Sequence, residues 1–241
     1  LAANAVNPVT GEALNLTKLD IKGLGKAKYI LKEGGTLGDL YTTSNLRFND
    51  NGYVEVDKNG NLLMTDEGED IYLGSVFPNH NLAWRNDFSY KGINLGVLFT
   101  ARLGGVCYSA TQANLDLYGV SEASAAARDA GGVLINGREM VDAQKWYQAI
   151  GSQSGLPQYY LYSATNVRLQ ELSLGYTFPR KWFRNKLGLT VSFVGRNLWM
   201  IYCKAPFDPE AVASTGLNYQ GIDYFMMPSM RNLGFNVQFQ F

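Results

Sequence analysis

The last ten residues of the chain constrain its fold most strongly. They read NLGFNVQFQF (232–241), and apolar side chains alternate with Asn, Gly and Gln throughout. Alternation of period two places one set of side chains on each face of a β-strand. In a water-soluble sheet the apolar face would pack on a core, whereas in a membrane barrel it would face lipid and the polar face would line the lumen. The pattern alone leaves both structures open.

Four further segments repeat this alternation and predict strands of similar length. They span residues 81–91, 93–103, 166–178 and 187–199, so the five predicted strands contain 10–13 residues each. Strands of soluble proteins average ~5–6 residues, and tilted strands of membrane barrels need ~9–11. The lengths therefore favour a barrel.

Short and long connections alternate between these strands. Lys91-Gly92 and the segment 179–186 are short, whereas about 62 residues separate 103 from 166 and about 30 separate 199 from 230. Bacterial outer-membrane barrels have short periplasmic turns and long extracellular loops. Aromatic residues at both strand ends would form the interfacial belts of such a barrel: Tyr90, Tyr176, Phe178 and Phe241 at the short-turn end, and Trp84 and Trp199 at the other.

Composition excludes several classes of protein. Lys+Arg and Asp+Glu are both 21, whereas nucleic-acid binders carry a basic excess. The longest apolar run, Leu198–Cys203, is far shorter than the ~20 residues of a membrane-spanning helix. The start lacks Met and a signal-peptide pattern, so we interpret the chain as a fragment or a processed product. Cys107 and Cys203 are expected to be thiols in apolar surroundings, with a disulfide as the alternative.

The long connections are predicted to carry structure of their own. In 120–132, Ser121 can cap a short helix that Gly131 ends, and Asp142 can cap a second helix over 142–151. Near the N-terminus, 26–31 and 37–48 read as strands, and 49–64 reads as a hairpin arm with Asn-Gly turns. We expect extracellular loops at about 33–80, 104–165 and 200–229.

Several blocks resemble a known family in the order in which that family carries them. They are GVSEASAAARDAGG (119–132), NVRLQELSLGYTFP (166–179), VGRNLWMIYCKAPFDPEA (194–211) and GIDYFMMPSMRNLGFNVQFQF (221–241). The chain from about residue 28 onward resembles the C-terminal part of SusC/RagA-type TonB-dependent outer-membrane transporters.

The resemblance implies an all-β fold, the C-terminal strands of a 22-stranded transmembrane barrel closed by a plug domain. It also implies import of glycans or peptides, a SusD-like surface lipoprotein as partner, and energy from the TonB complex acting on the plug. This chain contains no plug and no first half of the barrel. Because an open sheet edge is not viable in lipid, an N-terminal barrel and plug portion is an expected partner.

Candidate site residues follow from the predicted faces. Arg85, Asp87, Arg102, Glu171 and Arg196 fall on the polar, lumen-facing side, where they either contact substrate or plug or pair with one another. Tyr159, Tyr160 and Tyr162 could stack on sugar rings, or else pack within a loop. The apolar terminal residues resemble an outer-membrane assembly signal, or are simply the end of a strand: Phe235, Val237, Phe239 and Phe241.

The sequence indicates no catalytic residues, metal site or cofactor. Asp66, Glu67, Glu69 and Asp70 read as a solvated acidic loop, because the spacing of a calcium loop is absent. His80 stands alone, which excludes a Ser-His-Asp triad or a histidine metal site within this chain. Two alternatives remain to the transporter: a soluble β-sandwich carbohydrate-binding module, and an outer-membrane hydrolase barrel.

Overall fold

The chain folds into two compact units. The computed structural model describes residues 6, 8–11, 18–65, 68–214, 216 and 219–241. Unit 1 comprises 1–77, 106–162 and 212–226, and unit 2 comprises 78–105, 163–211 and 227–241. The segments of unit 1 overlap the three regions expected as extracellular loops, and their extracellular position stays a prediction.

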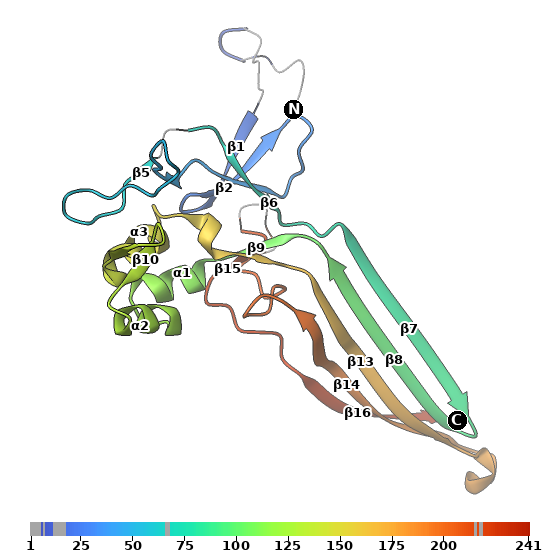
Figure 1. Ribbon diagram of the computed structural model, residues 1–241. Coiled ribbons are helices and arrows are strands. Elements are labelled where there is room, and N and C mark those ends of the chain that lie inside the picture. The colour runs from blue at the N-terminus through green and yellow to red at the C-terminus, as the bar shows by residue number, and fades with distance from the viewer. Residues whose placement is uncertain (1–5, 7, 12–17, 66–67, 215, 217–218) are drawn as a thin grey trace. The chain divides into compact units, whose positions relative to one another are not determined.

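Unit 2 is one antiparallel sheet of five strands, coloured from green to red in Figure 1. The order across the sheet is β16-β14-β13-β8-β7. Strands that follow one another along the chain within this sheet are therefore also neighbours in space. All five predicted strands are confirmed: β7 (His80–Tyr90), β8 (Ile93–Leu103), β13 (Asn166–Phe178), β14 (Gly188–Cys203) and β16 (Asn232–Gln240).

The end of β14 differs from the prediction. Alternation stops near Trp199, but the strand continues to Cys203 because Tyr202 and Cys203 still pair with Val167 and Asn166 of β13. The backbone absorbs the change in pattern at Asn197, which has a φ of 51°. Pairing with β13 therefore makes β14 longer than its alternating sequence predicts.

The faces of the sheet differ in chemistry across all five strands. One row of directly paired residues consists of Phe88, Leu95, Leu174, Phe193 and Phe235. Paired residues point to the same side of a sheet. The side chains of Phe88, Phe193 and Phe235 are 60%, 51% and 81% exposed. One face of unit 2 is therefore an exposed apolar surface, and the other carries the polar set.

A β-bulge in β13 changes which residues share a face. Against β8 the register shifts between Leu169 and Glu171, which leaves Gln170 as an extra residue of β13, whereas the shift against β14 places the extra residue on β14. Because side chains alternate with a period of two, one extra residue reverses the faces of everything before it. Arg168 therefore points to the same side as Glu171, although simple alternation would separate them.

The two short turns lie side by side at one end of the sheet. Lys91 and Gly92 have φ of 49° and 88°, as the two-residue hairpin turn requires. A Cβ on Gly92 would lie 2.7 Å from the carbonyl oxygen of Thr177, so only glycine fits. The N–H of Thr177 donates to the Gly92 carbonyl over 2.7 Å. The second turn contains a 3₁₀ helix, η2 (Arg180–Phe183).

Unit 1 is built from short elements around one hydrophobic core. Its largest sheet has the order β1-β2-β3-β6, with smaller sheets β12-β9-β15, β4-β5 and β10-β11. The strands are β1 (Lys18–Leu24), β2 (Ala27–Lys32), β3 (Asp39–Thr42), β4 (Asn45–Leu46), β5 (Met64–Thr65), β6 (Ile71–Ser75), β9 (Val106–Ser109), β10 (Val133–Ile135), β11 (Glu139–Val141), β12 (Leu161–Ser163) and β15 (Ile222–Asp223). The buried apolar cluster includes Tyr29, Leu40, Leu156 and Ile222.

The helices of unit 1 begin at side-chain caps. The predicted caps are confirmed: Ser121 accepts from the N–H of Ser124 at the start of α2 (Glu122–Asp129), and Asp142 accepts from that of Lys145 at the start of α3 (Ala143–Gly151). Gly131, at φ 81°, follows the end of α2 as predicted. Two helical elements of unit 1 were not predicted: α1 (Ala110–Leu117), which Ser109 caps, and the 3₁₀ turn η1 (Pro157–Tyr160).

The helices of unit 1 are short. Among the described residues, no helix has the length and hydropathy to cross a membrane.

Both cysteines of the chain are thiols. Cys107 is buried in unit 1, whereas the Cys203 sulfur lies 3.6 Å from the carbonyl oxygen of Ala205 and 3.8 Å from that of Phe207.

Candidate functional site

The polar face of unit 2 holds four of the predicted lumen residues in one ion network. Glu171 on β13 lies 3.0 Å from Nε of Arg196 on β14 and 3.5 Å from Nη1 of Arg85 on β7. Arg85 also pairs with Asp87 on its own strand, at 2.8 Å. Glu171 is thus shared between two guanidinium groups from strands on either side of it. The network spans the sheet from β7 to β14.

Arg102 lies on the same face but outside this network. It pairs in register with Asn81 of β7 and with Asn166 of β13. No ion pair joins Arg102 to a carboxylate among the residues that the structure describes. Of the five predicted lumen residues, the structure therefore brings four together and leaves one near the long-connection end.

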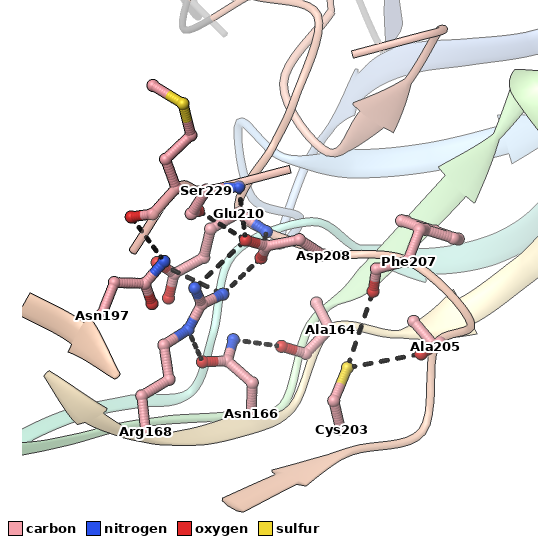
Figure 2. Close-up of polar contacts among 11 residues, drawn as sticks. Ala164, Asn166, Arg168, Asn197, Cys203, Ala205, Phe207, Asp208, Glu210 and Ser229 are labelled. Atoms are coloured by element: carbon pink, nitrogen blue, oxygen red, sulfur yellow. Dashed lines mark hydrogen bonds and ion pairs between the residues drawn. The ribbon is translucent and has the colours of Figure 1, made fainter. Parts of the chain in front are cut away.

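A second polar cluster surrounds Arg168, and we refer to Arg168, Asp208 and Ser229 as the clasp (Figure 2). The Arg168 side chain is 2% exposed, and its guanidinium donates two hydrogen bonds to the Asp208 carboxylate, one through each terminal nitrogen. Its Nε donates to Oδ1 of Asn166 over 3.0 Å, and Glu210 lies 3.5 Å from Nη2. Such two-pronged pairing fixes orientation as well as distance.

Asp208 also gathers donors from the connection between β14 and β16. The Ser229 hydroxyl donates to Oδ2, and the Glu210 N–H donates to Oδ1 over 3.0 Å. Burial alone raises the pKa of Asp208, but hydrogen bonds from Arg168 and Ser229 outweigh it and lower the pKa to about 2. The carboxylate is therefore charged at neutral pH, and the clasp fastens this connection over the polar face of the sheet.

The clasp was not predicted from the sequence, although a signal for it exists. Gln170 and Glu171 are consecutive polar residues in an otherwise alternating strand. Such a break marks a β-bulge, and allowing for it moves Arg168 to the polar face. Asp208 is 40 residues from Arg168 along the chain, so no local pattern could identify it as the partner.

The three candidate tyrosines of unit 1 have different surroundings. Tyr160 is 2% exposed and belongs to the hydrophobic core, so neither ring face is available to a sugar. This corrects the expectation for that residue, and burial together with the Asp116 carboxylate raises the pKa of its hydroxyl. Tyr159 is 44% exposed and meets Trp146 edge-on at 5.9 Å. Tyr162 is half-buried. Ligand stacking stays a prediction for Tyr159 and Tyr162.

The terminal apolar residues lie on the exposed apolar face of unit 2. Phe235, Val237 and Phe239 pair with Phe193, Val191 and Leu189 of β14. Phe241 follows the end of β16 and is almost fully exposed. The face of β16 agrees with the predicted alternation, whereas a role in assembly stays a prediction.

The acidic residues that the structure describes pair with basic side chains or lie apart. No group of three or more His, Cys, Asp or Glu side chains converges within the described ranges. Asp70 instead pairs with Lys32 at 2.8 Å and Lys18 at 3.2 Å. The other acidic-loop residues include Asp66 and Glu67, which lie outside the described residues.

Comparison with known proteins supports the family resemblance. No protein-family model matches the chain. It is 25% identical over 198 residues to "TonB-dependent receptor P3" of Formosa agariphila, a match covering 78% of this chain and 19% of that relative. The chain thus spans about a fifth of its curated relative.

One solved structure supports the same fold. The RagAB peptide transporter aligns with 95% of this chain and 25% of its own, at a TM-score of 0.55 and 20% identity. The RagAB peptide importer in the closed-closed state aligns at a TM-score of 0.49 and 17% identity, over 95% of this chain and 25% of its own. The sequence match to a TonB-dependent receptor and the fold of the first structure confirm the resemblance to SusC/RagA-type TonB-dependent transporters.

Proposed function

We propose that this chain is the C-terminal part of the barrel of an outer-membrane nutrient importer of the SusC/RagA type. The observation that carries the proposal is the two-sided sheet of unit 2. Large apolar side chains such as Phe88, Phe193 and Phe235 are exposed on one face, while Arg85, Glu171 and Arg196 are paired on the other. Lipid outside and a wet lumen inside demand this division.

Strand length supports a bilayer crossing. The five strands contain 9 to 16 residues, and a tilted strand crosses the hydrocarbon core with ~9–11. Their inner members, β14, β13 and β8, are paired on both sides, so their backbone polar groups are satisfied without water. The edge strands would pair with the N-terminal barrel portion.

A soluble β-sandwich would need a second sheet packed on the apolar face. The described part of unit 2 forms a single sheet, and the large side chains on its apolar face are exposed. No observation within the described part of unit 2 therefore favours the carbohydrate-binding alternative.

The turns define the proposed orientation. Lys91-Gly92 and the η2 turn join strands at one end, and the longer connections that build unit 1 leave from the other. Short turns face the periplasm in bacterial barrels, and long loops face outward. Unit 1 would then be the extracellular part of this chain.

The cargo is proposed to be a glycan or a peptide, and the similarity of the fold to the RagAB peptide transporter supports testing peptides first. Proposed partners are the N-terminal barrel and plug, a SusD-like surface lipoprotein, and the TonB complex acting through the plug. Transport of this kind requires no covalent chemistry from the chain, so we propose no enzyme activity.

The test is an import assay on cells that carry the whole transporter. Deletion of its gene should abolish uptake of labelled oligopeptides or oligosaccharides, and the wild-type copy should restore uptake. Fractionation should recover the protein from the outer membrane only with detergent. Recovery as a soluble protein that binds glycans without detergent would overturn the proposal in favour of the carbohydrate-binding module.

The polar face offers a sharper variant within the same assay. Glu171→Gln removes the carboxylate that Arg85 and Arg196 share, whereas Thr190→Ala changes the same face without touching the network. Assembly of both variants should be normal, because exposed ion pairs contribute only about 0–1 kcal/mol. Altered uptake in Glu171→Gln alone would assign the network a role in the lumen.

A further inference from the structure

The short-turn end of unit 2 is strongly basic; we use this name for the sheet end formed by residues 88–95 and 176–190. It carries no Asp or Glu. It carries five basic residues: Lys91, Arg180, Lys181, Arg184 and Lys186. Basic and acidic residues balance over the whole chain, so this concentration of one sign is a local feature.

These basic side chains have no protein counter-charge within the described residues. The basic residues of η2 and Arg184 are exposed, and none of the five lies within 4.0 Å of a carboxylate in the described ranges. Three of the four arginines in the strands of this sheet behave differently, because Arg85, Arg168 and Arg196 are paired with carboxylates. An anion from outside this chain could therefore serve as the counter-charge of these basic side chains.

Aromatic rings border the same end and continue into the apolar face. Tyr176 meets Phe178 edge-on at 5.0 Å, and Phe178 lies 5.7 Å from Trp182. Trp182 is 66% exposed although it is the largest apolar side chain of the turn. Lys91 Nζ lies 5.1 Å from the ring centre of Tyr90. Tyr and Trp with Lys and Arg just beyond them are the side chains that occupy a membrane–water interface.

We propose that the short-turn end binds the phosphate groups of anionic glycerophospholipids. The inference rests on the proposed function, since it requires the sheet to cross a bilayer. Cationic heads would contact the headgroup phosphates while Trp182 and Phe178 lie at the boundary with the acyl chains. Guanidinium and ammonium groups form charge-assisted hydrogen bonds with phosphate, and clustered bases beside a membrane segment attract anionic lipid.

The experiment titrates the whole purified transporter, in detergent, with phosphatidylglycerol or phosphatidylcholine and counts bound lipids by native mass spectrometry. Wild type should bind phosphatidylglycerol more tightly than phosphatidylcholine. The triple variant Lys181→Gln/Arg184→Gln/Lys186→Gln should lose about tenfold or more of that preference. A matched variant, Lys22→Gln/Lys58→Gln/Arg231→Gln, removes the same charge from exposed positions elsewhere and should keep the preference.

Three results would overturn the inference: equal binding of the two lipids by wild type, an unchanged preference in the triple variant, or an equal loss in the matched variant. Failure of the proposed function looks different, because the protein would then not be recovered from the outer membrane at all. A membrane-inserted importer without lipid preference would refute this inference alone. Insertion of the triple variant, checked by protease resistance in phosphatidylcholine vesicles, separates lost binding from lost folding.

Discussion

In unit 1, Tyr29, Leu40 and Ile222 are almost fully buried, whereas in unit 2 Phe88, Phe193 and Phe235 are more than half exposed. Both units bury charged groups: unit 1 buries carboxylates such as Asp39 and Asp116, and unit 2 buries the Arg168–Asp208 ion pair. One chain therefore contains a conventional apolar core and a sheet with its apolar side chains outward. Apolar periodicity therefore identifies one face of a strand, whereas the medium around that face decides whether its side chains are buried by protein.

The clasp should give the largest effect, and it tests the buried charge of unit 2. Arg168→Met leaves the Asp208 carboxylate without its main partner, so we expect a loss of about 3–5 kcal/mol in the free energy of unfolding. Denaturant titration of the detergent-refolded protein measures it. Arg196→Met is the matched control, because the Arg196 side chain is 65% exposed and its ion pair should contribute only about 0–1 kcal/mol.

The double variant Arg168→Met/Asp208→Leu sharpens this test. It removes both charges, so much of the lost stability should return. Equal losses in Arg168→Met and Arg196→Met would contradict a special role for the clasp.

The next effect tests whether the exposed apolar face meets lipid. Phe193→Arg should reduce stability in a bilayer by about 2–4 kcal/mol, since a charge on the lipid face is costly near the midplane. Ser192→Arg alters the neighbouring residue on the opposite face and should be tolerated. Folding yields into phosphatidylcholine vesicles compare the two. If both variants insert equally well, the two faces of the sheet do not differ in solvent.

The pH dependence of the clasp should be smaller than its complete removal. The pKa of Asp208 is lowered to about 2, below an ordinary value of about 3.9. Its contribution is thus full above about pH 4 and is lost as the pH falls toward about 2. Unfolding of wild type and Asp208→Asn across this range measures it, and the variant should have the flatter profile. Parallel profiles would show that Asp208 is not the titrating group.

The smallest expected effect tests whether unit 1 opens independently of unit 2. Ser121→Ala removes the cap of α2 and should cost about 1 kcal/mol, whereas Ser154→Ala at an exposed position should stay within about 0.5 kcal/mol. Hydrogen exchange should report faster opening in unit 1 alone. Faster exchange in the strands of unit 2 would show that the units do not open independently.

The sequence predicted the features that depend on residues close together in the chain, namely strands and helix caps. Strict alternation located all five strands of unit 2, and Ser121 and Asp142 marked two helices because their side chains satisfy the first backbone N–H groups. The α1 helix escaped because ATQANLDL has little apolar periodicity and depends on contacts in unit 1. The parallel pairing of Ile222 with Tyr108 joins residues far apart in the chain, and no short-range signal specifies it.

The site was predicted to the same extent. Arg85, Asp87, Glu171 and Arg196 were placed on one face because the period-two spacing of their polar side chains holds where these strands pair. Arg168 was missed because a single extra residue reversed its face. For Tyr160 the sequence left stacking and packing open because tyrosine suits both a binding surface and a core, and only the packing of unit 1 decides between them.

Each unit is assembled from three separate stretches of chain. No single pair of cuts therefore releases either unit as one continuous piece. During synthesis the β7–β8 hairpin emerges before the second stretch of unit 1 exists, and the last stretch of each unit comes near the end. A single crossover within residues 78–226 would leave both units with segments from two parents, so each unit would have to tolerate foreign neighbours in its own sheet or core.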